Sequence, residues 1–194
     1  MRSIVLWDVM GTLVHDPFFV EMPQFFGMTF EDLLEAKHPR AWVEFELGKC
    51  TETEFLHRFF DDRRDFDREG FIRAVRASYR WLPGAEALLG DLREAGCSMH
   101  AFSNYPIWYR MIEERLGLSR FLDWTFVSCE TGLRKPDSRC YAAVLRELDV
   151  TADQCVFVDD HVRNCEAARQ IGIRSVVFEG MDALRTSLRA SQVE

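Results

Sequence analysis

Short apolar runs alternate with longer amphipathic segments through most of the second half of the chain. The runs 98–103, 124–128, 155–159 and 175–178 predict strands, and another run, 4–8, predicts a first strand far ahead of them. Residues between the later runs carry apolar side chains at helical spacing. Strands and helices that alternate in this way are typical of a parallel sheet with right-handed crossovers. The pattern therefore predicts an α/β fold.

Proline and glycine mark the ends of the predicted helices. A proline near the first turn and a glycine just past the last turn are the usual punctuation of a helix. The helices expected on this basis are 83–96 with Pro83 and Gly96 at its ends, 107–116 before Gly117, 136–148 with Pro136 in its first turn, and 164–171 before Gly172.

The segment 15–79 has a different character. Aromatic and charged residues recur there at helical spacing, and no strand pattern is visible. We therefore expect a small helical cap at 15–79, inserted after the first strand. The remaining residues, 1–14 and 80–194, are expected to form the sheet-containing core.

Composition narrows the range of partners. The chain has 194 residues, of which 47% are hydrophobic, and its net charge of -8 disfavours nucleic acid or an anionic membrane as a partner. A small phosphorylated substrate is still compatible, since a metal ion and a lysine reverse the local sign. The six cysteines form no CxxC pair. With no leader and no apolar stretch of about 18 residues visible, we expect a cytoplasmic protein without a membrane span.

Polar side chains follow three of the predicted strands. Asp8, Ser103 and Asp159 each stand at the end of an apolar run. Because ligands of open parallel sheets bind beyond the carboxyl ends of the strands, these three side chains are expected to share one crevice. Carboxylates in such a place need a partner, and Lys135 in RKPD is the candidate. The combination predicts a site for a cation and an anionic ligand.

Four short motifs resemble those of the haloacid dehalogenase superfamily, in the same order along the chain. They are Asp8 with Gly11 and Thr12, Ser103–Asn104, Lys135 with Pro136 and Asp137, and Asp159–Asp160 with Asn164. The resemblance implies a Rossmann-like parallel sheet of order 3-2-1-4-5 with a helical cap after strand 1. Longer stretches, such as KHPRAWVEFELG and NYPIWY, resemble a helical-cap, phosphatase-like subgroup that includes plant flavin mononucleotide (FMN) hydrolases.

The resemblance also implies roles for these residues. Asp8 would be the nucleophile that forms an aspartyl phosphate, and Lys135 would pair with Asp8 and the phosphate. Ser103 and Asn104 would donate to phosphoryl oxygens. The implied cofactor is Mg²⁺, and its ligands would be Asp8, the backbone oxygen of Met10 and Asp160, with Asp159 acting behind them or through water.

Met10 departs from the family pattern. Most phosphatases of the family have a second aspartate there, which protonates the leaving alcohol, and a thioether cannot do this. His15, His161 or a cap residue is a possible replacement. Alternatively, the leaving group needs little protonation, or the chain binds phosphates and turns over poorly.

The expected function is Mg²⁺-dependent hydrolysis of a phosphate monoester, with FMN or a similar small metabolite as substrate and Trp108 as a possible substrate contact. A metal-free dehalogenase that uses Asp8 against carbon is an alternative, but Asp159–Asp160 makes little sense without a cation. A phospho-receiver domain has its acidic pair after the first strand and no place for a cap. We expect a monomer or a homodimer.

Overall fold

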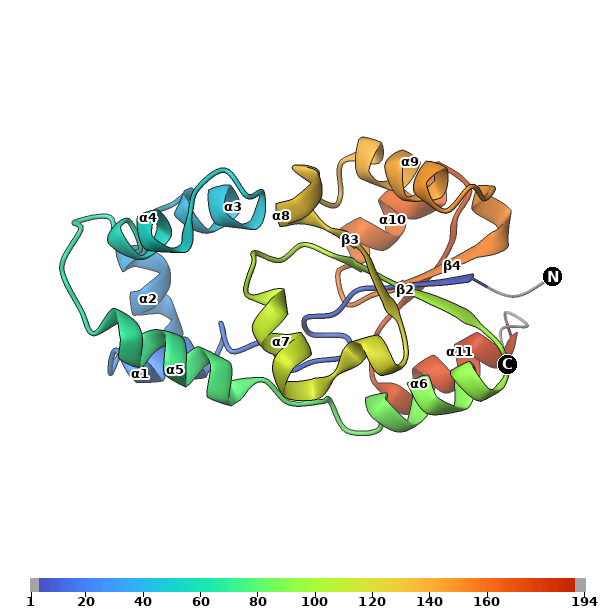
Figure 1. Ribbon diagram of the computed structural model, residues 1–194, viewed down its shortest axis with the longest axis horizontal. Coiled ribbons are helices and arrows are strands. Elements are labelled where there is room, and N and C mark those ends of the chain that lie inside the picture. Colours follow the sequence, from blue (N-terminus) through green and yellow to red (C-terminus); the bar gives the residue numbers. More distant parts are fainter. Residues whose placement is uncertain (1–3, 191–194) are drawn as a thin grey trace.

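Five parallel strands form the centre of the molecule. The structure is a computed structural model that describes residues 4–190 (Figure 1). The strands are β1 (Ile4–Trp7), β2 (Ser98–Ser103), β3 (Asp123–Val127), β4 (Cys155–Asp159) and β5 (Arg174–Val177), in the order β3-β2-β1-β4-β5. Ile4 pairs with Ser98 on one side and with Cys155 on the other. The predicted fold class and strand order are confirmed.

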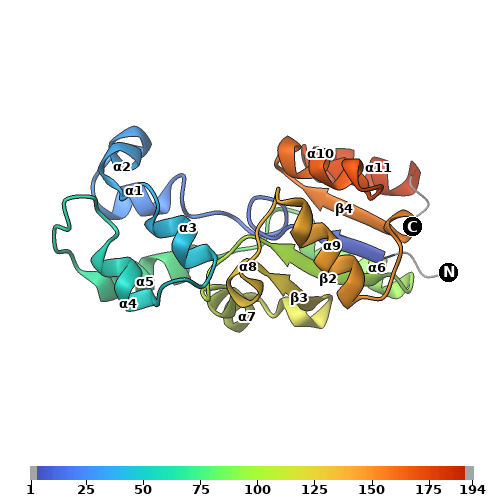
Figure 2. The same ribbon diagram turned by 90° about the horizontal axis from the view of Figure 1, so that it is seen from above.

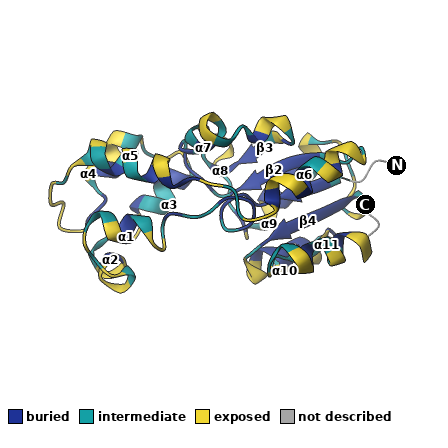
Figure 3. Ribbon diagram, turned by 90° about the horizontal axis from the view of Figure 1, so that it is seen from below, coloured by how far each residue is buried: buried dark blue, intermediate teal, exposed yellow. Residues whose placement is uncertain are grey.

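Two layers of helices cover the sheet. One face carries α6 (Ala85–Glu94), α7 (Tyr109–Leu116) and α11 (Met181–Ala190), and the other carries α9 (Ser138–Glu147) and α10 (Val162–Gln170) (Figure 1). Because successive side chains of a strand point to opposite faces, Val5 and Trp7 join the first layer and Leu6 the second. Figure 3 shows the strands buried and the outer helix faces exposed.

Five short helices follow β1 and precede α6. They are α1 (Glu21–Phe25), α2 (Phe30–Ala36), α3 (Ala41–Glu46), α4 (Glu52–His57) and α5 (Arg68–Ser78). Figure 2 shows them as a group beside the sheet. Capping boxes begin α2 at Thr29 and α4 at Thr51. Phenylalanine rings in edge contact hold the group together, for example Phe26 against Phe60 and Phe59 against Phe71. The exact division into core and cap stays a prediction, and parts of 1–14 and 80–194 lie outside the described residues.

The remaining elements are short. They are α8 (Ser128–Thr131) and two 3₁₀ turns, Leu118–Arg120 and Ala152–Gln154. The sequence did not predict α8 or α11, and it placed the start of α9 too early. Pro136 precedes that helix, whose N-cap is Asp137 with a side chain that accepts a hydrogen bond from the Arg139 amide. Within residues 4–190, no helix combines the length and the apolar character required to span a bilayer.

Candidate active site

Asp8 stands directly after β1, at the carboxyl end of the central strand. Its amide donates to the carbonyl oxygen of Val158 on β4 at 2.8 Å, which extends the strand pairing by one residue. Its side chain is buried, and Oδ2 accepts a hydrogen bond from the Thr12 hydroxyl at 3.2 Å. β1 therefore places Asp8 at the edge of the sheet, and Thr12, in the turn that follows, fixes the orientation of its carboxylate.

Lys135 is the cation beneath this carboxylate. Its side chain is 1% exposed, and Nζ lies 2.7 Å from Oδ1 of Asp8 and 2.6 Å from Oδ2 of Asp159. Burial alone would lower the pKa of Lys135, but the negative charges of Asp8 and Asp159 outweigh it and raise that pKa above its ordinary value. The lysine is therefore held as an ammonium between two carboxylates.

Asn104 positions the Lys135 backbone. Its side-chain amide donates to the carbonyl oxygen of Lys135 at 2.9 Å, and the Lys135 amide donates to its oxygen at 2.8 Å. Both polar ends of the Asn104 side chain are thus engaged by the main chain. Ser103, one residue earlier, is 2% exposed, and its hydroxyl has no hydrogen-bond partner among residues 4–190. A buried, unpartnered hydroxyl beside the site is what a phosphoryl oxygen would satisfy.

The two acids after β4 have different surroundings. Asp159 is fully buried, and besides Lys135 it accepts from the His161 amide at 2.7 Å and from the Asn164 side chain at 3.0 Å. Asp160 is partly exposed, and its Oδ1 lies 2.7 Å from Nδ1 of His161. Asp159 is therefore fully engaged by groups inside the protein, whereas the Asp160 carboxylate is accessible to a ligand.

Gly11 makes room for the Asp160 carboxylate. Its φ of 77° lies in the left-handed region, and a Cβ added there would approach Oδ2 of Asp160 to 2.7 Å. Any other residue would be strained by its backbone angle and would push the carboxylate away. The glycine of the first motif thus shapes the place that Asp160 occupies.

Negative charge exceeds positive charge at this point. Asp8 and Asp159 flank the ammonium of Lys135, and the carboxylate of Asp160 adds negative charge near Asp8. The pKa of Asp8 is raised to about 7, chiefly by burial, with Asp159 and Asp160 adding to the rise and Lys135 opposing it. Single ligand atoms of Asp159, Asp160 and His161 lie within 4.8 Å of one another. Hard oxygen donors with excess negative charge fit a divalent cation such as Mg²⁺.

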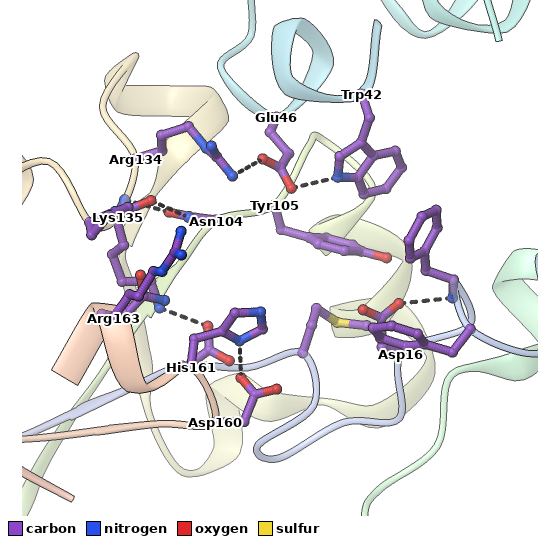
Figure 4. A pocket seen from close by; sticks show the side chains of 16 residues that line it. Asp16, Trp42, Glu46, Asn104, Tyr105, Arg134, Lys135, Asp160, His161 and Arg163 are labelled. Atoms are coloured by element: carbon purple, nitrogen blue, oxygen red, sulfur yellow. Dashed lines mark hydrogen bonds and ion pairs between the residues drawn. The ribbon is translucent and has the colours of Figure 1, made fainter. Parts of the chain in front are cut away.

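A cavity of about 350 Å³ opens above these groups (Figure 4). Eight residues that the sequence singled out line it: Asp8, Met10, Asn104, Lys135, Pro136, Asp160, His161 and Asn164. Its wall on the side of the inserted helices includes Phe18, Phe19 and Trp42, and Tyr105 lies between the two sides. The cavity thus has a charged floor and an aromatic wall.

Comparison with known proteins agrees with this geometry. A family model described as haloacid dehalogenase-like hydrolase matches residues 3–172. The chain belongs to this family. It is 46% identical over 185 residues to the chloroplastic flavin mononucleotide hydrolase 1 of Arabidopsis thaliana. This match covers 95% of this chain and 76% of that protein. The chain is 26% identical over 175 residues to a sesquiterpene phosphatase of Aspergillus oryzae, covering 86% of this chain and 85% of that protein.

A solved structure shares the fold of this haloacid dehalogenase-like hydrolase. It is a family enzyme of Bacteroides thetaiotaomicron in complex with magnesium, with a TM-score of 0.77 and 19% identity, and the match covers 96% of this chain and 98% of that one. Because the Arabidopsis relative is described as chloroplastic, the cytoplasmic location of the hydrolase stays a prediction.

Four predicted site residues of the hydrolase are absent from the cavity lining: Ser103 and Asp159, which are buried next to lining residues, and His15 and Trp108. Nε2 of His15 lies 2.7 Å from the carboxylate of Glu21, which also pairs with Arg80. Trp108 is 1% exposed, and its indole nitrogen donates to Glu52. The Trp108 ring packs against Phe45 and Phe55 on the inserted helices, so it belongs to the aromatic core in this structure.

Five polar residues of the cavity were missed from the sequence: Asp16, Glu46, Tyr105, Arg134 and Arg163. Glu46 is buried at the end of α3, accepts a hydrogen bond from the Trp42 indole at 2.5 Å and lies 3.0 Å from Arg134 (Figure 4). The one sequence signal for Arg134 is its position directly before Lys135. Glu46 and Arg134 tie the inserted helices to the sheet side of the cavity.

Glu46 gives the hydrolase a pH-dependent stability. Burial raises the pKa of Glu46 to about 7, against the lowering effect of Arg134. The folded state therefore binds a proton more tightly than the unfolded state, and stability falls as pH rises from 4.5 to 7. We expect the free energy of unfolding of Glu46→Gln, relative to that of wild type, to increase by up to about 3 kcal/mol as pH rises over this range. Urea unfolding of both proteins across the range measures it, with the exposed Glu69→Gln as control. A pH-independent difference would contradict the expectation.

Proposed function

We propose that the hydrolase cleaves phosphate monoesters with Mg²⁺ and that FMN or a similar small metabolite is its substrate. The observation that carries this proposal is the buried Lys135, which joins Asp8 to Asp159 at the floor of a cavity open to a phosphate. Phosphatases among the relatives support the reaction class, and the 46% identical FMN hydrolase supports the substrate.

Asp8 is proposed as the nucleophile. One carboxylate oxygen would attack phosphorus and form an aspartyl phosphate, which water then hydrolyses. Lys135 would hold Asp8 in place and balance the charge of the incoming phosphate, and the Ser103 hydroxyl would donate to a phosphoryl oxygen. Asn104 would act on Lys135 through the backbone contacts described above, in addition to any contact with phosphate.

The residues around Asp160 fit a divalent cation. Asp8, Asp160 and the backbone oxygen of Met10 would hold Mg²⁺, which when bound would offset the repulsion between the carboxylate and the phosphate. Asp159 would not bind the cation directly, since its oxygens already accept hydrogen bonds from Lys135, Asn164 and the His161 amide.

The aromatic wall supports a substrate with a flat ring. Phe18, Phe19 and Trp42 line the cavity, and a volume of about 350 Å³ lies within the range of small-ligand sites. Stacking on such side chains suits an isoalloxazine ring. This wall distinguishes the proposal from a site for simple sugar phosphates.

A phosphate-release assay tests the proposal. We expect FMN to be hydrolysed with Mg²⁺ and not with EDTA, and to have a higher kcat/KM than ribose 5-phosphate. Equal values for the two substrates would contradict the flavin assignment. Halide release from a 2-haloacid without Mg²⁺ would contradict the reaction class.

The two acids after β4 should respond differently to substitution. Asp160→Asn is expected to weaken Mg²⁺ binding at least tenfold with little loss of stability, because Asp160 is partly exposed. Asp159→Asn is expected to lower stability by about 2–4 kcal/mol, because the fully buried Asp159 accepts from Lys135, the Asn164 side chain and the His161 amide, and a single amide oxygen cannot satisfy all of these donors. Isothermal titration with MgCl₂ and urea unfolding measure the two effects, with the exposed Asp61→Asn as control. Equal Mg²⁺ affinities of the two variants would contradict the assignment.

A further inference from the structure

The position two residues after Asp8 lacks a group that can transfer a proton. Met10 lines the cavity and is 8% exposed, and its thioether neither donates nor accepts protons at neutral pH. A phosphate monoester with an alkoxide leaving group needs such a group in both steps of the proposed reaction. In this protein a carboxyl or imidazole group elsewhere on the cavity wall would have to supply it.

The chain after Met10 folds back on itself. Gly11 donates to the carbonyl oxygen of Val14 at 2.8 Å, and the amide of Val14 donates to that of Val9 at 2.9 Å. The next residues pair with the chain that returns after α5, since the backbone amide of His15 donates to the carbonyl oxygen of Arg80 at 2.9 Å. This compact turn returns residues 14–16 to the neighbourhood of Asp8.

Neighbouring residues after the turn have opposite surroundings. The side chain of His15 binds Glu21 and does not line the cavity, whereas that of Asp16 lines it. In Figure 4 the Asp16 carboxylate lies at the cavity beside the hydroxyl end of Tyr105. Asp16 is the carboxyl group that the fold places on this wall without a charged partner: its one side-chain hydrogen bond among residues 4–190 comes from the Phe18 amide to Oδ1, at 2.9 Å.

We propose that Asp16 is the general acid and base of the hydrolase, in the place that Met10 leaves vacant. This inference rests on the proposed function. When Asp8 attacks phosphorus and the bond to the leaving oxygen breaks, protonated Asp16 gives its proton to that oxygen. In the second step ionised Asp16 takes a proton from water, the water oxygen bonds to phosphorus, and the Asp8 carboxylate leaves. Asp16 is then protonated again, and the products are the alcohol and inorganic phosphate.

The electrostatic surroundings of Asp16 suit this role. Burial raises its pKa, and the negative charge of Asp160 adds to the rise, while the Phe18 amide, His15 and His161 lower it. The other titratable groups that face it are Tyr79, Tyr105 and Glu46. A carboxyl group with a raised pKa gives up and takes back a proton more readily near neutral pH.

The test compares two aryl phosphates whose leaving groups differ in basicity. Asp16→Asn keeps the oxygen that accepts from Phe18, so it should fold, and Asp16→Ser keeps an acceptor if it does not. With phenyl phosphate, whose leaving group needs a proton, we expect kcat to fall about 10²–10³-fold. With 2,4-dinitrophenyl phosphate, we expect a burst of dinitrophenolate at near wild-type rate followed by slow turnover, because only the second step still needs Asp16.

Three further proteins complete the experiment. Asp16→Glu is expected to recover part of the activity and to restore the pH profile, and exposed Asp61→Asn is expected to behave as wild type. An unchanged rate in Asp16→Asn, or an equal loss in the burst and on phenyl phosphate, would overturn the role of Asp16. Asp8→Asn is run beside them: if it is active, the proposed function fails, and if it is inactive while Asp16→Asn resembles wild type, only this inference fails.

Discussion

Asp8→Asn is expected to lower phosphate release by four or more orders of magnitude. Asparagine is nearly isosteric with aspartate, but its neutral amide is a far weaker nucleophile, and loss of a nucleophile in other hydrolases has effects of this size. The variant also presents one negative charge fewer to Lys135 and to a bound cation. Steady-state release of phosphate from FMN with Mg²⁺ measures the loss.

The fold of this variant should be preserved or strengthened. Burial and two neighbouring carboxylates raise the pKa of Asp8 to about 7, so its ionised form costs stability as pH rises from 3.8 towards 7. Removing the charge removes that cost, whereas Lys135 keeps Asp159 as a partner at 2.6 Å. We therefore expect a thermal midpoint at pH 8 that is no lower than that of wild type.

Two outcomes would contradict the nucleophile assignment. One is an Asp8→Asn protein that keeps a tenth or more of the wild-type rate, and the other is a folded Asp8→Asn protein that still forms a covalent phosphoenzyme. Asp61→Asn serves as the matched control, because it makes the same chemical change at an exposed loop. Its rate and thermal midpoint should equal those of wild type.

The strands were predictable because each is a short apolar run with a clear end. β2 and β4 were predicted to the residue, and β1, β3 and β5 to within one residue at each end. The strand order came from the family resemblance, since pairing between distant strands leaves no local trace in one sequence. The helix α8 has four residues, which is too short for a helical period to appear. The helix α11 buries only Leu184 and Leu188, a weak signal at the end of the chain.

The floor of the site was predictable for a similar reason. Asp8 and Asp159 occupy the ends of strands, so the sheet itself brings them together, and Lys135 is the buried cation that they require. The cavity wall depends on how the inserted helices sit on the sheet. Asp16 and Glu46 reach the cavity only through that packing, and the same packing makes Trp108 a core residue. A sequence pattern shows which face of an element is buried, but not which other element packs against that face.

Lys135→Met is expected to have the largest effect on stability. The substitution keeps a long side chain but leaves Asp8 and Asp159 without their common ammonium, and removing one partner of a buried ion pair costs about 3–5 kcal/mol. Lys135 is 1% exposed, so water cannot replace it. We expect a loss of this size in urea unfolding at pH 8 with EDTA present, together with loss of phosphate release.

The same variant should recover relative stability in acid. Without Lys135, the pKa of Asp8 in the folded protein would rise further, because Lys135 is the group that lowers it. The penalty for a carboxylate with a raised pKa grows as pH rises from its unfolded value, so the deficit relative to wild type should be smaller at pH 5.5 than at pH 8. Lys49→Met, at an exposed lysine, is the matched control and should show no deficit at either pH. A deficit of equal size at both pH values would mean that lost packing, and not uncompensated charge, explains the effect.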